Sequence, residues 1–145
     1  MKKNVASSLL LITLLLITHL SCSRKDALEG SKVFREITPA EVKERLEKGD
    51  EIAVLDVRTK EEYESDTGHL KVAILLPIQE LERRYHELDS LKAKEIVAYC
   101  RSGNRSGRAA RFLVEKGFKV YNMVGGILEW NKLNKENTDL KKEAR

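Results

Sequence analysis

One cysteine stands in a run of small and basic residues, and this run has the side chains best suited to nucleophilic chemistry. The run consists of Cys100, Arg101, Ser102, Gly103, Asn104, Arg105 and Ser106. Residues 95–99 before it predict a short strand, and residues 107–116 after it predict a helix. A strand-to-helix turn offers backbone N–H groups and a helix N-terminus, both of which stabilise an anion. We therefore expect a lowered pKa for the Cys100 thiol, a nucleophilic thiolate and a binding site for an anionic substrate.

Two charged residues follow another predicted strand and are candidates for a supporting role. Residues 52–55 form an apolar run, typical of a strand buried on both faces, and Asp56 and Arg58 come after it. Ligands of parallel sheets bind outside the carboxyl ends of the strands. We therefore expect these two side chains to hold the Cys100 loop in place without contacting the substrate. The alternative is a local turn hydrogen bond by Asp56 and a solvated Arg58.

Predicted strands and helices alternate along the body of the chain. The strands are expected at residues 33–37, 52–55, 72–76, 95–99 and 120–121. Two of the helices have a clear start signal, a threonine followed three residues later by glutamate, at Thr38 and at Thr59. The alternation predicts an α/β fold with three layers, a central and mostly parallel five-stranded sheet with helices on both faces.

The N-terminal segment is predicted to be a signal peptide. Two lysines precede an apolar stretch at residues 9–17, and residues 18–22 resemble the box at which bacterial lipoproteins are lipidated. Cys22 is the expected lipidation site, although His19 stands where leucine is usual. The alternatives are a signal peptide cleaved nearby and an uncleaved anchor. We therefore expect an exported protein, anchored by lipid on the periplasmic side of a bacterial membrane.

These interpretations divide the chain into four parts. They are a signal peptide with its lipoprotein box at residues 1–22, a tether at 23–32, one folded domain at 33–134 and a charged C-terminal tail at 135–145. Only two cysteines occur in the sequence, so lipidation of Cys22 would leave Cys100 as the only thiol. An intramolecular disulfide would then be impossible.

Charge and composition narrow the classes of ligand. The 145 residues include 27 Lys and Arg against 23 Asp and Glu, a net charge of +4. Basic residues are interleaved with acidic ones, without a basic stripe containing aromatic residues, so no nucleic-acid partner is expected. No group of His, Cys, Asp and Glu residues has the spacing of metal ligands, so we predict no metal site. The small net positive charge fits the binding of a small anion.

A set of short motifs resembles the single-domain rhodanese-type sulfurtransferases. The matching segments are residues 55–59 with 61–63, 67–70, 73–74 with Pro77, 99–106, and 120–122 with 125–127 and Trp130. They occur in the family's order and span nearly all of residues 34–130, which implies a rhodanese-like domain at 33–134. The chain departs from the family pattern at Lys71 and Val72, where a glycine is usual in second place. The resemblance implies that these residues shape the wall facing the Cys100 loop.

The same resemblance implies a thiosulfate sulfurtransferase without a cofactor. The Cys100 thiolate attacks the outer sulfur of a small anionic donor such as thiosulfate, sulfite leaves, and the persulfide passes its sulfur to a thiol or to cyanide. The expected substrate-binding residues are Arg101, Ser102, Gly103, Asn104, Arg105 and Ser106. Backbone N–H groups stabilise the thiolate, and the two arginines either bind sulfonate oxygens or remain solvated. The two serines either donate to the substrate or cap the following helix. The protein is expected to be a monomer.

Two rival functions remain open. Cysteine phosphatases also use a Cys-to-Arg loop after a strand, but with five intervening residues, whereas four separate Cys100 from Arg105 here. The shorter loop favours attack on sulfur over the binding of phosphate. The second rival is a membrane-tethered persulfide carrier or interaction module with little turnover.

Overall fold

A computed structural model describes residues 34–143 of the chain. The predicted signal peptide at 1–22, the lipidation site Cys22 and the tether at 23–32 lie outside the described residues. Within 34–143, no helix is long and apolar enough to cross a membrane.

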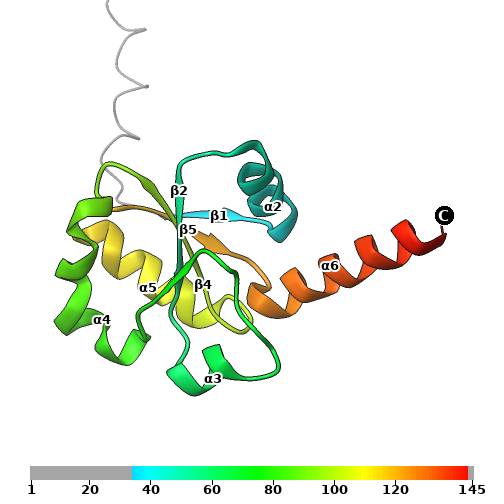
Figure 1. The fold of residues 1–145 in the computed structure, drawn as a ribbon. Helices are drawn as coiled ribbons and strands as arrows, with labels where there is room; N and C mark the ends of the chain where they lie inside the picture. The colour runs from blue at the N-terminus through cyan, green and yellow to red at the C-terminus, as the bar shows by residue number, and fades with distance from the viewer. Residues whose placement is uncertain (1–33, 144–145) are drawn as a thin grey trace, which may run out of the picture. The chain divides into compact units, whose positions relative to one another are not determined.

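A five-stranded sheet forms the centre of the domain (Figure 1). The elements are, in chain order, β1 (Arg35–Ile37), α2 (Pro39–Lys48), β2 (Ile52–Asp56), α3 (Lys60–Glu64), β3 (Ala73–Leu75), α4 (Ile78–Arg84), a 3₁₀ helix (Tyr85–Leu91), β4 (Glu95–Tyr99), α5 (Asn104–Glu115), β5 (Lys119–Met123) and α6 (Gly126–Glu143). The strands lie in the order β1-β5-β4-β2-β3, and every neighbouring pair is parallel. The predicted three-layer α/β fold is therefore confirmed.

Two separate apolar clusters cover the two faces of the sheet. On one face, Ile96 and Ala98 of β4 pack with residues of α4 and α5, including Leu113. On the other face, Val97 and Tyr99 pack with residues of α2 and α6. Successive side chains of a strand point to opposite faces, so a strand that is covered twice reads as a continuous apolar run. Figure 1 shows α4 and α5 on one side of the sheet and α2 on the other.

Both predicted helix start signals form as expected. The side chain of Thr38 accepts from the backbone N–H of Glu41, whose carboxylate in turn accepts from the Thr38 N–H at 2.8 Å. Thr59 and Glu62 make the same reciprocal pair at the start of α3. Each pair satisfies backbone donors that the first turn of a helix otherwise leaves unbonded.

Several element boundaries differ from those predicted, among them the strands expected at 72–76 and 120–121, which are β3 and β5. Helix α5 begins at Asn104 rather than at 107, because Gly103 takes a left-handed conformation (φ 99°) that turns the chain directly into the helix. Residues 78–91 form two successive helices, α4 and the 3₁₀ helix. Helix α6 runs across the predicted boundary at residue 134 as far as Glu143.

Candidate active site

The Cys100 thiol lies at the carboxyl end of β4, enclosed by the turn that leads into α5. Its side chain is buried, and the Gly103 backbone N–H donates to Sγ at 3.2 Å. Ser106 Oγ lies 3.5 Å from the same sulfur. Burial is the largest influence on the Cys100 pKa and raises it. The hydrogen bonds from Ser106, Ser102 and Gly103 outweigh burial, so the pKa of the thiol is lowered. The predicted activation of Cys100 therefore has a structural basis in this turn.

Ser106 lies behind the sulfur, inside the protein. Its hydroxyl is fully buried, donates to Asn122 Oδ1 at 2.7 Å, and lies 3.1 Å from the Gly103 carbonyl oxygen. Asn122 is itself buried on β5, and sequence reasoning assigned it no role. Its place in the Val120–Asn122 motif was the available signal. Ser106 is therefore a hydrogen-bonding partner of the thiol, and its burial keeps it out of contact with molecules in the solvent.

Three other predicted site residues face solvent beside the thiol. Arg101, Ser102 and Asn104 are exposed, whereas Gly103 is buried. Of these three exposed residues, only Ser102 acts on the sulfur, and it does so through its backbone N–H. These side chains form the solvent-exposed rim of the loop.

The first residues of α6 hold the Cys100 loop through backbone hydrogen bonds. Ile127 N–H donates to the Cys100 carbonyl at 2.9 Å, and Leu128 N–H donates to the Arg101 carbonyl at 3.3 Å. The backbones approach so closely that a Cβ on Gly126 would lie 2.3 Å from the Cys100 carbonyl oxygen. In the sequence, the Gly125-Gly126 pair belongs to a segment that matches the family, but the residues alone assign it no role at the Cys100 loop. The structure shows that Gly126 lets α6 bind the backbone of the reactive loop.

Arg105 is paired with a glutamate that sequence reasoning did not place at the site. Its Nη1 and Nη2 donate to the two carboxylate oxygens of Glu62, each at 2.6 Å. This contact is the main reason that the pKa of Arg105 is raised and that of Glu62 lowered. In the sequence, Glu62 could be recognised as the capping-box residue of α3, but that pattern does not predict its contact with Arg105.

Asp56 and Arg58 form a buried ion pair. Arg58 donates to the Asp56 carboxylate through Nε and Nη2, at 3.0 and 2.7 Å, and to the Gly68 carbonyl at 2.8 Å. Burial opposes the charge of Arg58, but Asp56 outweighs it, so the pKa of Arg58 is raised. The alternative of a solvated Arg58 is wrong because its side chain is 1% exposed. The local turn bond does form, from Arg58 N–H to Asp56 at 2.9 Å.

This pair braces the site indirectly. It holds the turn at Gly68, and Leu70 N–H from the same turn donates to the Tyr99 hydroxyl at 3.2 Å. Val57 N–H donates to the carbonyl of Tyr99, the residue before Cys100. The pair therefore supports the end of β4 and makes no direct contact with the loop after Cys100 among the hydrogen bonds of residues 34–143.

The altered Lys71–Val72 segment lies away from the thiol. Both residues line a hollow of about 590 Å³ together with residues of α2 and α6, among them Leu46 and Trp130. No residue of the 100–106 loop lines this hollow. The expectation that Lys71 and Val72 face the active loop is therefore wrong. They precede the amino end of β3, whereas the loop follows the carboxyl end of β4, and all strands of the sheet are parallel.

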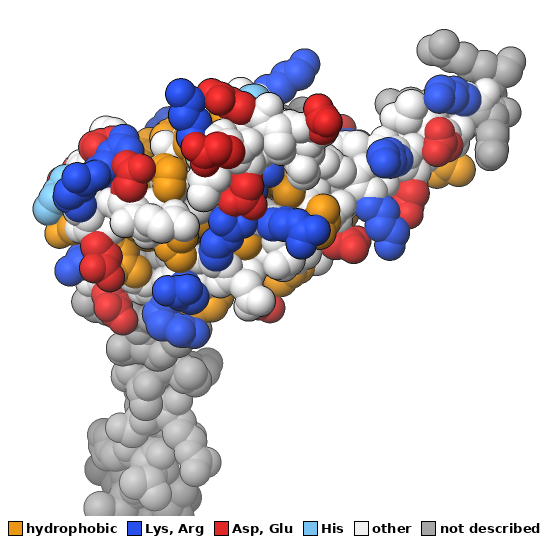
Figure 2. Space-filling view, turned by 90° about the horizontal axis from the view of Figure 1, so that it is seen from below, with side chains coloured by type: hydrophobic (Ala, Val, Ile, Leu, Met, Phe, Trp, Pro, Cys, Tyr) orange, Lys and Arg blue, Asp and Glu red, His pale blue; other side chains and the backbone are white. Residues whose placement is uncertain are grey.

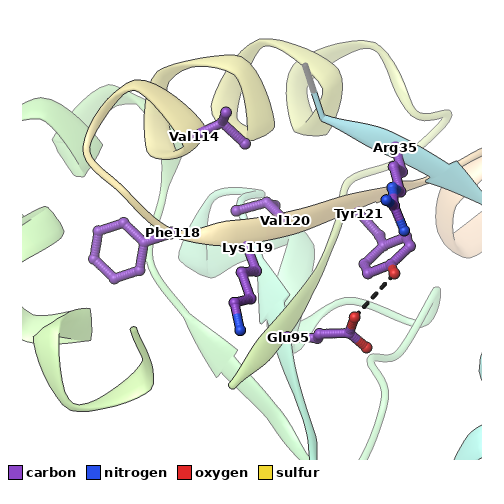
Figure 3. A pocket seen from close by; sticks show the side chains of 7 residues that line it. All are labelled: Arg35, Glu95, Val114, Phe118, Lys119, Val120 and Tyr121. Atoms are coloured by element: carbon purple, nitrogen blue, oxygen red, sulfur yellow. Dashed lines mark hydrogen bonds between the residues drawn. The ribbon is translucent and has the colours of Figure 1, made fainter. Parts of the chain in front are cut away.

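A second hollow lies at the amino ends of β4 and β5 (Figure 3). It measures about 310 Å³ and is lined by Arg35, Glu95, Val114, Phe118, Lys119, Val120 and Tyr121. Glu95 is already bonded to the Tyr121 hydroxyl at 3.0 Å and to Arg45 at 2.6 Å. Glu95 begins β4, and Cys100 follows its last residue, so this hollow is separate from the thiol. Within the described part of the chain, no three His, Cys, Asp or Glu residues gather as metal ligands.

Comparison with known proteins agrees with this geometry. The family model "Rhodanese-like domain" matches residues 38–133. A sulfurtransferase of Allochromatium vinosum is 33% identical over 99 residues, covering 68% of this chain and 89% of that protein. The solved structure of a rhodanese-related protein from Thermoplasma volcanium is 31% identical, with a TM-score of 0.61 and coverage of 68% and 92%.

Rhodanese-like sequence also occurs inside longer relatives. The tRNA uridine(34) hydroxylase of Cytophaga hutchinsonii is 33% identical over 118 residues, which are 79% of this chain. The chain spans only 36% of that enzyme's length. The similarity to this relative therefore concerns one part of a larger protein.

Proposed function

The chain belongs to the rhodanese-like domain family, and from that premise we propose that it is a sulfurtransferase that carries sulfur as a persulfide on Cys100. The thiolate attacks the outer sulfur of a donor such as thiosulfate. The donor's S–S bond breaks and sulfite leaves with the bonding electron pair. A thiol or cyanide then attacks the outer sulfur of the persulfide and regenerates the Cys100 thiolate.

The observation that carries this proposal is the hydrogen-bonded environment of the Cys100 sulfur. A thiol with a lowered pKa needs no separate general base, and no histidine occurs between Cys100 and Ser106. The backbone N–H of Gly103 and the Ser106 hydroxyl are already placed to stabilise negative charge on the sulfur.

The test is direct detection of the persulfide. Purified protein covering the folded domain is incubated with thiosulfate and analysed by intact-mass spectrometry. We expect a mass increase of one sulfur atom that is lost on addition of cyanide with release of thiocyanate, and that is absent from Cys100→Ser. Failure to gain sulfur from thiosulfate and from an organic persulfide would contradict the proposal.

The phosphatase alternative is distinguished by the same pair of proteins. The four-residue gap between Cys100 and Arg105 makes a tighter loop than phosphate binding requires. Aryl phosphate hydrolysis by the wild type above the level of Cys100→Ser would favour a phosphatase. Persulfide formation with very slow release to acceptors would instead favour a sulfur carrier.

We further propose that the protein is exported and held at the periplasmic side of a membrane by lipid on Cys22. The support is the order of a basic start, an apolar stretch and a cysteine-ended box within residues 1–22. Such an anchor would place Cys100 outside the cytoplasm, where its donor and acceptor must also occur.

A further inference from the structure

The ion pair between Arg105 and Glu62 bears on which sulfur donor the site accepts. The guanidinium and the carboxylate meet through two parallel hydrogen bonds of 2.6 Å, a geometry that is strong and directional. The two side chains are 27% and 31% exposed, so water screens the pair only in part. The positive charge of Arg105 is thus matched by one negative charge at the site.

Glu62 is held where it is by its own helix. Its Oε2 also accepts from the Thr59 N–H at 3.2 Å, and the Thr59 side chain caps the first turn of α3. Glu62 therefore belongs to the framework of the site, and Arg105 is bound to an anchored carboxylate.

Little uncompensated positive charge remains around the thiol. Arg101 is the other cation of the loop; it is exposed, and no ion pair includes it within residues 34–143. Figure 2 views the molecule from the side where α3 lies and shows acidic and basic side chains intermingled on this face. Among the arginines of the 100–106 loop, Arg105 is paired and only Arg101 is in no ion pair within residues 34–143, so a dianionic donor approaches the thiolate with weak electrostatic assistance.

We propose that Glu62, by neutralising Arg105, makes the Cys100 site favour sulfur donors of low charge, organic persulfides R–S–SH, over the dianion thiosulfate. The inference rests on the proposed sulfurtransferase function and specifies its donor class. The Cys100 thiolate attacks the outer sulfur of R–S–SH, the donor's S–S bond breaks, and R–S⁻ leaves with the bonding pair. Cys100 then holds –S–SH, and the released thiolate takes a proton from water.

The test compares two donors in wild type and Glu62→Gln. Glutamine keeps an acceptor for the Thr59 N–H and for Arg105 but removes the negative charge. We expect kcat/KM with thiosulfate to rise about five- to tenfold, through a lower KM, because Arg105 becomes an unmatched cation. With cysteine persulfide, kcat/KM should change less, by under about threefold, since its net charge at neutral pH is about one unit less negative than that of thiosulfate.

Glu64→Gln is the matched control, because Glu64 lies on the same helix and pairs with Lys60 instead of Arg105. It should leave both donors unchanged. Unaltered donor selectivity in Glu62→Gln, or an equal loss with both donors, would overturn the inference. Should Glu62→Gln fail to fold, Arg105→Gln serves: it must reduce thiosulfate use far more than persulfide use, and an equal loss contradicts the inference. Wild-type protein that takes sulfur from neither donor would refute the proposed function itself.

Discussion

Ser106 is the side chain with the most direct influence on the Cys100 sulfur. Its hydroxyl has a single proton and three acceptors within reach, namely Cys100 Sγ, the Gly103 carbonyl oxygen and Asn122 Oδ1. When the sulfur ionises, donation from Ser106 to the thiolate becomes the stronger, charge-assisted bond. Ser106 therefore stabilises the ionised form of Cys100 and lowers the pKa of the thiol.

Replacing Ser106 with alanine should raise the pKa of Cys100. Losing a donor to the thiolate favours the protonated form, so the thiolate fraction at neutral pH falls. The midpoint of the pH profile for alkylation of Cys100 by iodoacetamide should move to higher pH, and the rate at pH 7 should fall. Ser102→Ala is the control, because only the backbone N–H of Ser102 acts on the sulfur. An unchanged profile in Ser106→Ala would show that the backbone alone sets the thiol pKa.

At the scale of elements, the loop is held between the start of α5 and the start of α6. The backbone N–H groups of Gly103, just before α5, and of Ser106, in its first turn, act on the sulfur. Helix α6 directs its first N–H groups at the carbonyls of Cys100 and Arg101. These are the donors that a helix N-terminus leaves free, so each helix gains hydrogen bonds where it also shapes the site. The close approach of α6 depends on Gly126.

Gly126→Ala should therefore damage both stability and the site. The residue has a φ of 57°, and its Cβ would collide with the Cys100 carbonyl oxygen. Gly117→Ala is the matched control, with a φ of 89° and open space around the added Cβ. The control should lose about 1 kcal/mol of unfolding free energy from the left-handed conformation alone. Gly126→Ala should lose roughly 1–3 kcal/mol more, from forced overlap in a packed region.

Urea unfolding and sulfur uptake together check this prediction. Gly117→Ala should take up sulfur at the wild-type rate, because Gly117 follows the C-terminal end of α5, whereas the Cys100 loop precedes its N-terminal end. Gly126→Ala should take up sulfur more slowly, because displacement of the Cys100 carbonyl moves the thiol. Equal unfolding free energies for the two variants would mean that α6 can shift away without cost.

At the scale of the whole molecule, the proposed lipid anchor on Cys22 would set where the site works. We expect full-length protein from a bacterial host to partition into the detergent phase, because a lipidated N-terminus is strongly apolar. Cys22→Ala should move the protein to the aqueous phase. Cys100→Ser removes the other cysteine and should leave the partitioning unchanged. Detergent-phase protein in Cys22→Ala would contradict lipidation at this residue.

The fold could be predicted, and Cys100 singled out as the candidate nucleophile, because the signals for both are local. Apolar runs such as 52–55 indicate strands covered on both faces, and Thr38 and Thr59 mark helix starts through contacts three residues apart. The turn at Cys100 is likewise made by neighbours in the chain, so its small and basic residues indicate an activated thiol.

The side chains that bond to the loop could not be predicted, because they come from distant segments of the chain. Glu62 lies 43 residues before Arg105, and Asn122 lies 16 residues after Ser106. No local pattern joins such pairs; they meet because the sheet order β1-β5-β4-β2-β3 sets β4 between β2 and β5. The sequence by itself determined the α/β fold and the candidate nucleophile, since short-range hydrogen bonds and hydrophobic periodicity depend on adjacent residues. Only the tertiary structure decided which charges and hydroxyls surround that nucleophile, because these depend on which strands lie side by side.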